Sequence, residues 1–104
     1  MLLHSVYFYL QADAPEDTAA CMERDIIGRL SSIPQILELW AGAPEGIERD
    51  VVDNGYAMSL HAVFKDRETL KAYQEDPVHV DFVQTYKVWF ERLRVFDTRL
   101  SEPE

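Results

Sequence analysis

Two side chains capable of acid–base chemistry, Tyr73 and His79, lie close together in the sequence. A histidine exchanges a proton near neutral pH, and a tyrosine phenol donates a hydrogen bond. Removal of a proton from an activated C–H bond needs such a base, together with a donor to the developing enolate or alkoxide. We therefore predict that, if the chain is an enzyme, His79 and Tyr73 are its catalytic residues, with His79 as the acid or base and Tyr73 as the hydrogen-bond donor.

The segment between these residues explains how they can meet. Asp76 is followed by Pro77, a pair typical of a helix start, because the carboxylate accepts from free backbone N–H groups and proline needs no N–H there. Tyr73 would then end one helix, and His79 would lie in the first turn of the next. The bend at Asp76-Pro77 would aim both side chains into one space between the helices and a sheet.

That space is predicted to be an apolar pocket. Alternate residues of strands form its floor, phenylalanines close its sides, and His4 adds a further polar group. Such a cavity with a few converging polar groups suits a small hydrophobic or aromatic ligand. The predicted substrate-binding residues are His4, Val6, Phe8, Leu60, Phe82, Phe90, Leu93 and Val95.

Each polar residue also has a structural interpretation. A histidine near a helix start often packs or caps, so His79 is either structural or part of the pocket. Tyr73 can bury its ring with the hydroxyl on water or a carbonyl. His4 is either a pocket hydrogen-bonder or a core histidine, and His61 is expected to be structural.

No metal or cofactor is predicted. Glu75, Asp76 and His79 are near in sequence, but neither an HExxH pattern nor a paired-cysteine spacing occurs. A capping role would also occupy the Asp76 carboxylate. Glycine-rich phosphate loops and nucleotide fingerprints are absent from the sequence.

The elements that position these residues follow from periodicity and from capping signals. Asp13 and Pro15 precede a helical stripe that ends near Ser31, and Asp66 caps a short helix before the one that starts at Asp76. Residues 43–54 read as an acidic surface loop, and residues 101–104 as a frayed polar tail. The predicted strands span residues 2–10, 35–43, 55–64 and 89–98.

This order of elements predicts an α+β fold, a ferredoxin-like four-stranded antiparallel sheet with the helices on one face. The opposite face would carry Tyr7, Tyr9, Val63 and Phe96, which is too apolar to remain in contact with water. We therefore predict a homodimer in which two such sheet faces pack together to form a dimeric α/β barrel.

Length and charge limit the possible partners. The chain has 104 residues, enough for a single domain spanning 1–104, and a net charge of −9. This charge argues against nucleic acid or an anionic membrane as the main partner. Cys21 is the single cysteine, the apolar first residues lack the pattern of a signal peptide, and no segment is long enough to span a membrane. We expect a cytoplasmic protein.

Several of these features together resemble a known family. They are His4, Pro34, Gly42, Gly55-Tyr56, Phe64, the run Ala72-Tyr73-Gln74-Glu75-Asp76-Pro77-Val78-His79-Val80-Asp81-Phe82, and Val95-Phe96-Asp97. The chain resembles, over nearly its whole length, the stress-responsive dimeric α/β barrel (Dabb) domain family. The Tyr-x-x-x-Pro-x-His core is the most specific part of this likeness, which implies a dimer whose two sheets form a barrel.

The resemblance also implies a type of reaction. Olivetolic acid cyclase, an enzyme of this family, closes a linear polyketide by aldol chemistry without metal or cofactor, and its tyrosine–histidine pair matches Tyr73 and His79. Its strand-one histidine matches His4. The present chain differs at Asp76, where that enzyme has histidine, at Val83, where it has glycine, and at Ala62, where it has valine.

Three hypotheses follow. The first is a cofactor-free, polyketide cyclase-like enzyme acting on a carbonyl-rich small molecule. The second is a non-catalytic dimer that binds a small ligand or has a stress-related structural role, since most members of the family have no assigned reaction. The third is a cofactor-free monooxygenase, because antibiotic-biosynthesis monooxygenases share the dimeric barrel.

Overall fold

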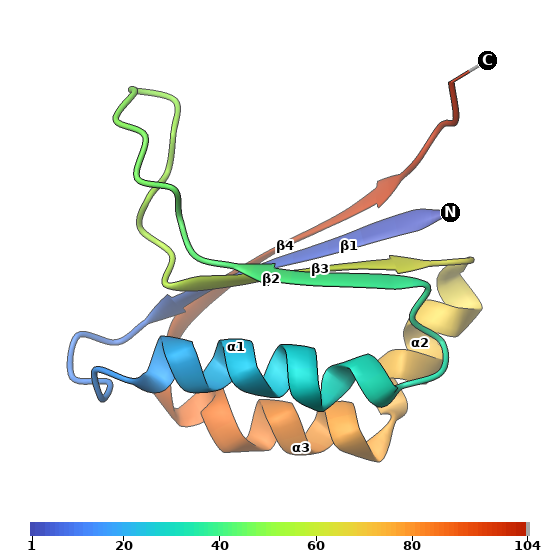
Figure 1. Ribbon diagram of the computed structural model, residues 1–104, viewed down its shortest axis with the longest axis horizontal. Helices are drawn as coiled ribbons and strands as arrows, with labels where there is room; N and C mark the ends of the chain where they lie inside the picture. Colours follow the sequence, from blue (N-terminus) through green and yellow to red (C-terminus); the bar gives the residue numbers. More distant parts are fainter. Residues whose placement is uncertain (104) are drawn as a thin grey trace.

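The computed structural model describes residues 1–103 as a sheet with helices on one side (Figure 1). Its strands are β1 (Leu2–Leu10), β2 (Glu38–Gly42), β3 (Met58–Phe64) and β4 (Phe90–Arg99). Its helices are α1 (Thr18–Gly28), α2 (Arg67–Glu75) and α3 (Pro77–Tyr86), with short 3₁₀ turns at Leu30–Ser32 and Lys87–Trp89.

The four strands form one antiparallel sheet in the order β2-β3-β1-β4. Chain order and sheet order together define the ferredoxin-like arrangement, so the predicted α+β fold class is confirmed. In this order β1 is central, with β3 on one side and β4 on the other. The edge strand β4 therefore contributes side chains to any site built around β1.

The face of the sheet under the helices carries the core. Alternation along β1 and β3 puts one set of side chains there, as predicted from the period of two. The buried core comprises Val6, Phe8, Met22, Ile26, Leu30, Ile33, Met58, Leu60, Ala62, Phe64, Leu70, Tyr73, Phe82 and Tyr86. Three helices thus bury one face of the sheet, and none of them covers the other.

Some predicted boundaries are wrong by about one turn or less. The first helix begins at Thr18 rather than near Pro15, because the Ala14 N–H bonds to Gln11 O and the Thr18 N–H to Pro15 O in preceding turns. β3 begins at Met58 rather than Gly55, and β2 is shorter than predicted. The tail prediction concerns Ser101–Pro103, which form no helix or strand, and Glu104, which lies outside the described residues.

Both helix starts in the 66–79 region form as predicted. The Asp66 carboxylate accepts from the Thr69 N–H at 2.9 Å, and Thr69 bonds back to the Asp66 N–H as a capping box. The Asp76 carboxylate accepts from the Val78 N–H at 2.8 Å, with Pro77 at the first helical position. The break between α2 and α3 is therefore encoded locally by Asp76-Pro77.

This cap leads to a testable expectation for stability. Asp76→Ala and Asp76→His should each lower the free energy of unfolding by about 1 kcal/mol, because the Val78 N–H loses its acceptor. Urea denaturation would measure the change. Glu75→Gln is the matched control, since Glu75 is exposed and makes only a 3.9 Å surface pair with Lys71. An equal loss in the control would show that charge, rather than capping, is responsible.

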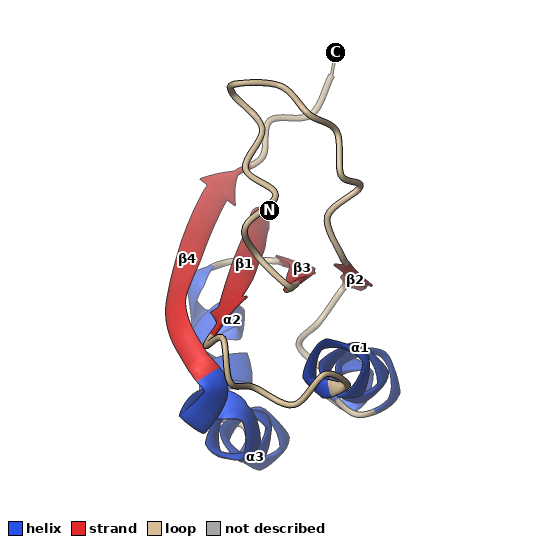
Figure 2. Ribbon diagram, turned by 90° about the vertical axis from the view of Figure 1, so that its left-hand side faces the viewer, coloured by secondary structure: helices blue, strands red, loops and turns tan. Residues whose placement is uncertain are grey.

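On the other side of the sheet, residues 43–57 form a long loop that stands away from the strands (Figures 1 and 2). The end of this loop returns to the sheet, where Tyr56 packs edge-on against Tyr7 with ring centroids 4.9 Å apart. The Tyr9 hydroxyl donates to Asp53 at 2.7 Å. The loop thus covers Tyr9 within the monomer, whereas Phe96 and Trp40 remain about half exposed.

None of the helices in residues 1–103 combines the length and the apolar character that crossing a membrane requires.

Candidate functional site

A cavity of about 200 Å³ lies between the sheet and helices α2 and α3. It is lined by His4, Val6, Phe8, Leu60, Tyr73, Gln74, His79, Phe82, Val83, Phe90, Leu93 and Val95. The structure therefore brings every side chain of the predicted pocket around one space. Val83, a wall-forming position in the family resemblance, lines it too, as does Gln74, which the sequence did not single out as a pocket residue.

Aromatic rings form the closed end of this cavity. The Phe8 ring lies 5.3 Å from that of Phe90 and 6.1 Å from that of Phe82, measured between centroids. On the β4 side of the cavity, Leu93 and Val95 stay about half exposed, and β4 is an edge strand of the sheet. A small molecule can therefore enter along β4 and meet apolar walls.

His79 is held by the turn that the Asp76-Pro77 break creates. Its Nδ1 lies 3.0 Å from Gln74 O, and since a carbonyl can only accept, Nδ1 carries the proton. Nε2 is left as the basic nitrogen, with no partner in residues 1–103. Burial lowers the pKa of His79, and the nearby His4 lowers it further, against the opposing effects of Gln74 and Asp76. The imidazole is thus neutral at pH 7 and available as a base.

Tyr73 is almost completely buried, and its ring lies 4.6 Å from that of His79, centroid to centroid. Burial raises the pKa of its phenol well above the usual value, so the hydroxyl keeps its proton at any physiological pH. Within residues 1–103 this hydroxyl donates to no other group. Tyr73 therefore offers a protonated donor beside the basic nitrogen of His79.

His4 completes the polar groups of the cavity through a partner that the sequence did not reveal. Its Nδ1 donates to the Asp97 carboxylate at 2.5 Å, and the ring lies 6.2 Å from that of Tyr73. Asp97 is opposite His4 in the β1–β4 register. A carboxylate on Nδ1 orients the imidazole and directs Nε2 the other way. Only the pairing of β1 with β4 could have identified Asp97.

The arrangement supplies a base, a neutral donor and an oriented second histidine around an apolar space. No group of three or more His, Cys, Asp and Glu side chains within residues 1–103 is placed to hold a metal ion. The chemistry these residues can perform themselves is proton removal from carbon or oxygen, with hydrogen bonding to the oxygen that becomes negative.

The third histidine, His61, lies on the opposite face of the sheet. Ser59 donates its hydroxyl to Gly42 O at 2.8 Å, so it accepts from His61 Nε2 at 3.0 Å. His61 Nδ1 then accepts from the Ser5 hydroxyl at 2.9 Å. In this arrangement the ring is neutral, and burial, which lowers the pKa of His61, favours that form.

A dependence of stability on pH follows from these two histidines. The pKa values of His61 and His79 are lower in the folded chain than the ordinary 6.5, so the unfolded chain binds protons first as the pH falls. The free energy of unfolding should therefore be flat above pH 7 and decrease below about pH 6.5. Urea titrations between pH 8 and 5 measure this slope. In His61→Gln it should be shallower, and an unchanged slope in that variant would contradict the assignment.

Comparison with known proteins places this geometry in context. The model of the stress responsive A/B barrel domain family matches residues 2–100. No curated protein sequence matches the chain. Solved structures of similar fold include a hydroxynitrile lyase from Passiflora edulis, with TM-score 0.78, 17% identity, and coverage of 99% of this chain and 95% of that one.

Two bacterial structures are also similar. A dimeric ferredoxin-like protein of unknown function from Thermobifida fusca has TM-score 0.81 and 16% identity, covering 95% of this chain and 90% of that one. A Dabb family protein from Mesorhizobium loti has TM-score 0.75 and 20% identity, with 97% of each chain covered. At these identities, the likeness establishes the fold and no activity.

Proposed function

The chain belongs to the stress responsive A/B barrel domain family, and we propose that it is a cofactor-free enzyme that makes or breaks a carbon–carbon bond at the carbonyl carbon of a small molecule. The observation that carries this proposal is the pairing of His79 and Tyr73. A neutral imidazole with a free Nε2 lies beside a buried phenol, both facing an apolar cavity. His79 is the general base and Tyr73 the hydrogen-bond donor.

For a molecule with three or more carbonyl groups, the step is an aldol addition. His79 Nε2 removes a proton from the carbon between two carbonyls, and the Tyr73 hydroxyl donates to the enolate oxygen. The enolate carbon then attacks a third, more distant carbonyl carbon of the same molecule. One C–H bond breaks, one C–C bond forms, and the proton returns from His79 to the new alkoxide. This is the chemistry of a polyketide cyclase.

The same groups suit the reverse type of step. A base that removes the hydroxyl proton of a cyanohydrin allows its C–CN bond to break, which releases a carbonyl compound and cyanide. One of the structurally similar proteins is a hydroxynitrile lyase. Cyanohydrins therefore belong in the substrate panel beside the poly-β-keto compounds.

The size of the cavity limits the substrate. A cavity of about 150 Å³ lined by apolar side chains accommodates benzene. The 200 Å³ available here suits a molecule with a single ring or a short chain, and anything longer must extend past Leu93 and Val95. We expect a small hydrophobic substrate of this size.

We infer a homodimer through the outer sheet face. Phe96 and Trp40 are about half exposed there, and the loop that stands off this face exposes Ile47 and Val51. Apolar residues gathered on one side of a small domain indicate a protein interface. Similar folds are described as dimeric. A second copy packed on this face would complete the barrel that is expected of the family.

Purified protein incubated with poly-β-keto esters that carry three or more carbonyl groups, and with aromatic cyanohydrins, tests the proposal, with product formation followed by mass spectrometry. Turnover above the buffer rate supports an enzyme. Binding without turnover favours the alternative of a ligand-binding dimer. The observation behind this alternative is that Asp76 caps a helix at the position where the cyclase has a histidine. Oxygen uptake with quinol substrates would instead favour the monooxygenase alternative.

A further inference from the structure

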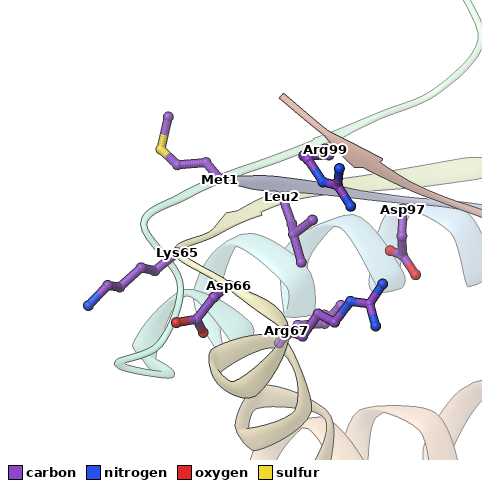
Figure 3. A pocket seen from close by; sticks show the side chains of 8 residues that line it. Met1, Leu2, Lys65, Asp66, Arg67, Asp97 and Arg99 are labelled. Atoms are coloured by element: carbon purple, nitrogen blue, oxygen red, sulfur yellow. The ribbon is translucent and has the colours of Figure 1, made fainter. Parts of the chain in front are cut away.

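A second and larger cavity, of about 590 Å³, opens at the end of the sheet where β1 begins and β3 ends (Figure 3). Lys65, Arg67 and Arg99 line it together with Asp66 and Asp97. We call it the basic cleft. It lies outside the proposed active site and serves no role in the chemistry proposed above.

Sheet register and a helix start bring these cations together. Arg99 pairs with Leu2 across β1 and β4, two positions beyond the His4–Asp97 pair on the same face. Lys65 follows directly on β3, whose last residue Phe64 also pairs with Leu2. Arg67 is the first residue of α2. In Figure 3 the Arg67 and Arg99 side chains turn toward the Asp97 side of the cleft, whereas Lys65 extends away.

The charge of the basic cleft is unusual for this chain. The protein has 19 acidic and 10 basic residues, so acids are available to neutralise most cations. Elsewhere Arg29 pairs with Asp81 and Arg94 with Asp53. Lys65, Arg67 and Arg99 have no ion-pair partner within 4.0 Å in the described part of the chain. The same holds for Arg24, Arg49, Lys87 and Arg92, so the basic cleft is distinguished by the three unpaired cations that line one space.

The two carboxylates of the basic cleft are already engaged. Asp66 accepts from the Thr69 N–H as the cap of α2, and Asp97 accepts from His4. In each carboxylate, the oxygen that accepts this hydrogen bond is therefore less available to Arg67 and Arg99. Two guanidinium groups that line one cleft without an ion-pair partner are suited to a carboxylate or phosphate, which a guanidinium can bind through paired N–H···O bonds.

The basic cleft is separate from the apolar cavity. No residue of the described chain lines both, and the His4–Asp97 hydrogen bond lies between them, with His4 on one side and Asp97 on the other. Leu2 and Leu70 add apolar surface to the cleft. We propose that the basic cleft binds a small organic anion, a carboxylate or phosphate monoester with a short apolar tail.

Three probes of equal chain length test this site: hexanoate, hexyl phosphate and hexan-1-ol. Each probe is titrated into the protein while the backbone amide chemical shifts are recorded by NMR, and at least one anion should bind. The largest shift changes should occur at Leu2, Arg67 and Arg99 rather than at Phe82 and Val83. Comparison of the two anions identifies the preferred headgroup. In Arg67→Gln/Arg99→Gln the affinity should fall about tenfold, and higher salt should weaken binding to the wild type.

Arg24→Gln is the matched control, because Arg24 is an exposed arginine of α1 that does not line the cleft. It should bind the anions as the wild type does. Equal affinity of hexanol and both anions, unchanged affinity in the double arginine variant, or shifts confined to the apolar cavity would each overturn the proposal. These outcomes are independent of turnover, so they do not depend on the proposed catalytic function.

Discussion

Replacing His79 with glutamine should lower kcat by about 10²–10⁴-fold on whichever substrate of the panel the protein turns over, because the general base is lost. Glutamine retains a donor that can reach Gln74 O but cannot accept a proton near neutral pH. In the wild type, kcat/KM should fall as the pH drops below the apparent pKa of His79, which lies below 6.5. Initial rates between pH 5 and 8 would show this dependence.

Tyr73→Phe separates the two catalytic roles. The substitution keeps the buried ring and removes only the hydroxyl that is proposed to donate to the enolate or alkoxide. Loss of one such donor lowers kcat by about 10²–10³-fold in other enzymes. Because no group in residues 1–103 accepts from the Tyr73 hydroxyl, thermal stability should change little.

The chain provides matched controls for both variants. Tyr86→Phe removes another largely buried tyrosine hydroxyl, one that donates to Asp25 and does not line the cavity. His61→Gln removes a histidine on the opposite face of the sheet. Both should retain turnover. Wild-type rates in His79→Gln and Tyr73→Phe would refute the assigned roles even if the protein proved to be an enzyme.

The second large effect is expected on assembly. Phe96→Asp and Trp40→Asp should each weaken the proposed homodimer at least a hundredfold, because a carboxylate buried in an apolar interface loses its hydration without gaining a partner. Sedimentation equilibrium at micromolar concentration would show the wild type with twice the monomer mass and the variants close to the monomer mass.

An exposed apolar residue on the helix side is the control for this experiment. Ile27 on α1 is as exposed as Trp40, about half, but lies away from the outer sheet face. Ile27→Asp should leave the dimer intact. A wild type that sediments as a monomer at micromolar concentration would contradict the inferred dimer, and dissociation of the Ile27→Asp variant would place the interface on the helices instead.

The sequence by itself determined the features that depend on neighbouring residues. Alternation along residues 2–10 and 58–64 assigned side chains to the two sheet faces, because successive residues of a strand must point to opposite sides. Asp66 and Asp76-Pro77 marked two helix starts, because caps act within one turn. The break between the two helices at Asp76-Pro77 also indicated that the side chains of Tyr73 and His79 point into one space.

Only the tertiary structure decided the features that join distant segments. Asp97 bonds to His4, and Arg99 lines the same cleft as Arg67, because β4 pairs with β1 in one particular register. A shift of that register by one residue would turn Asp97 and Arg99 to the opposite face. Register results from the packing of the whole sheet and not from local sequence. Thus the base and its donor could be found from their spacing, whereas the partner of His4 and the cluster of cations could not.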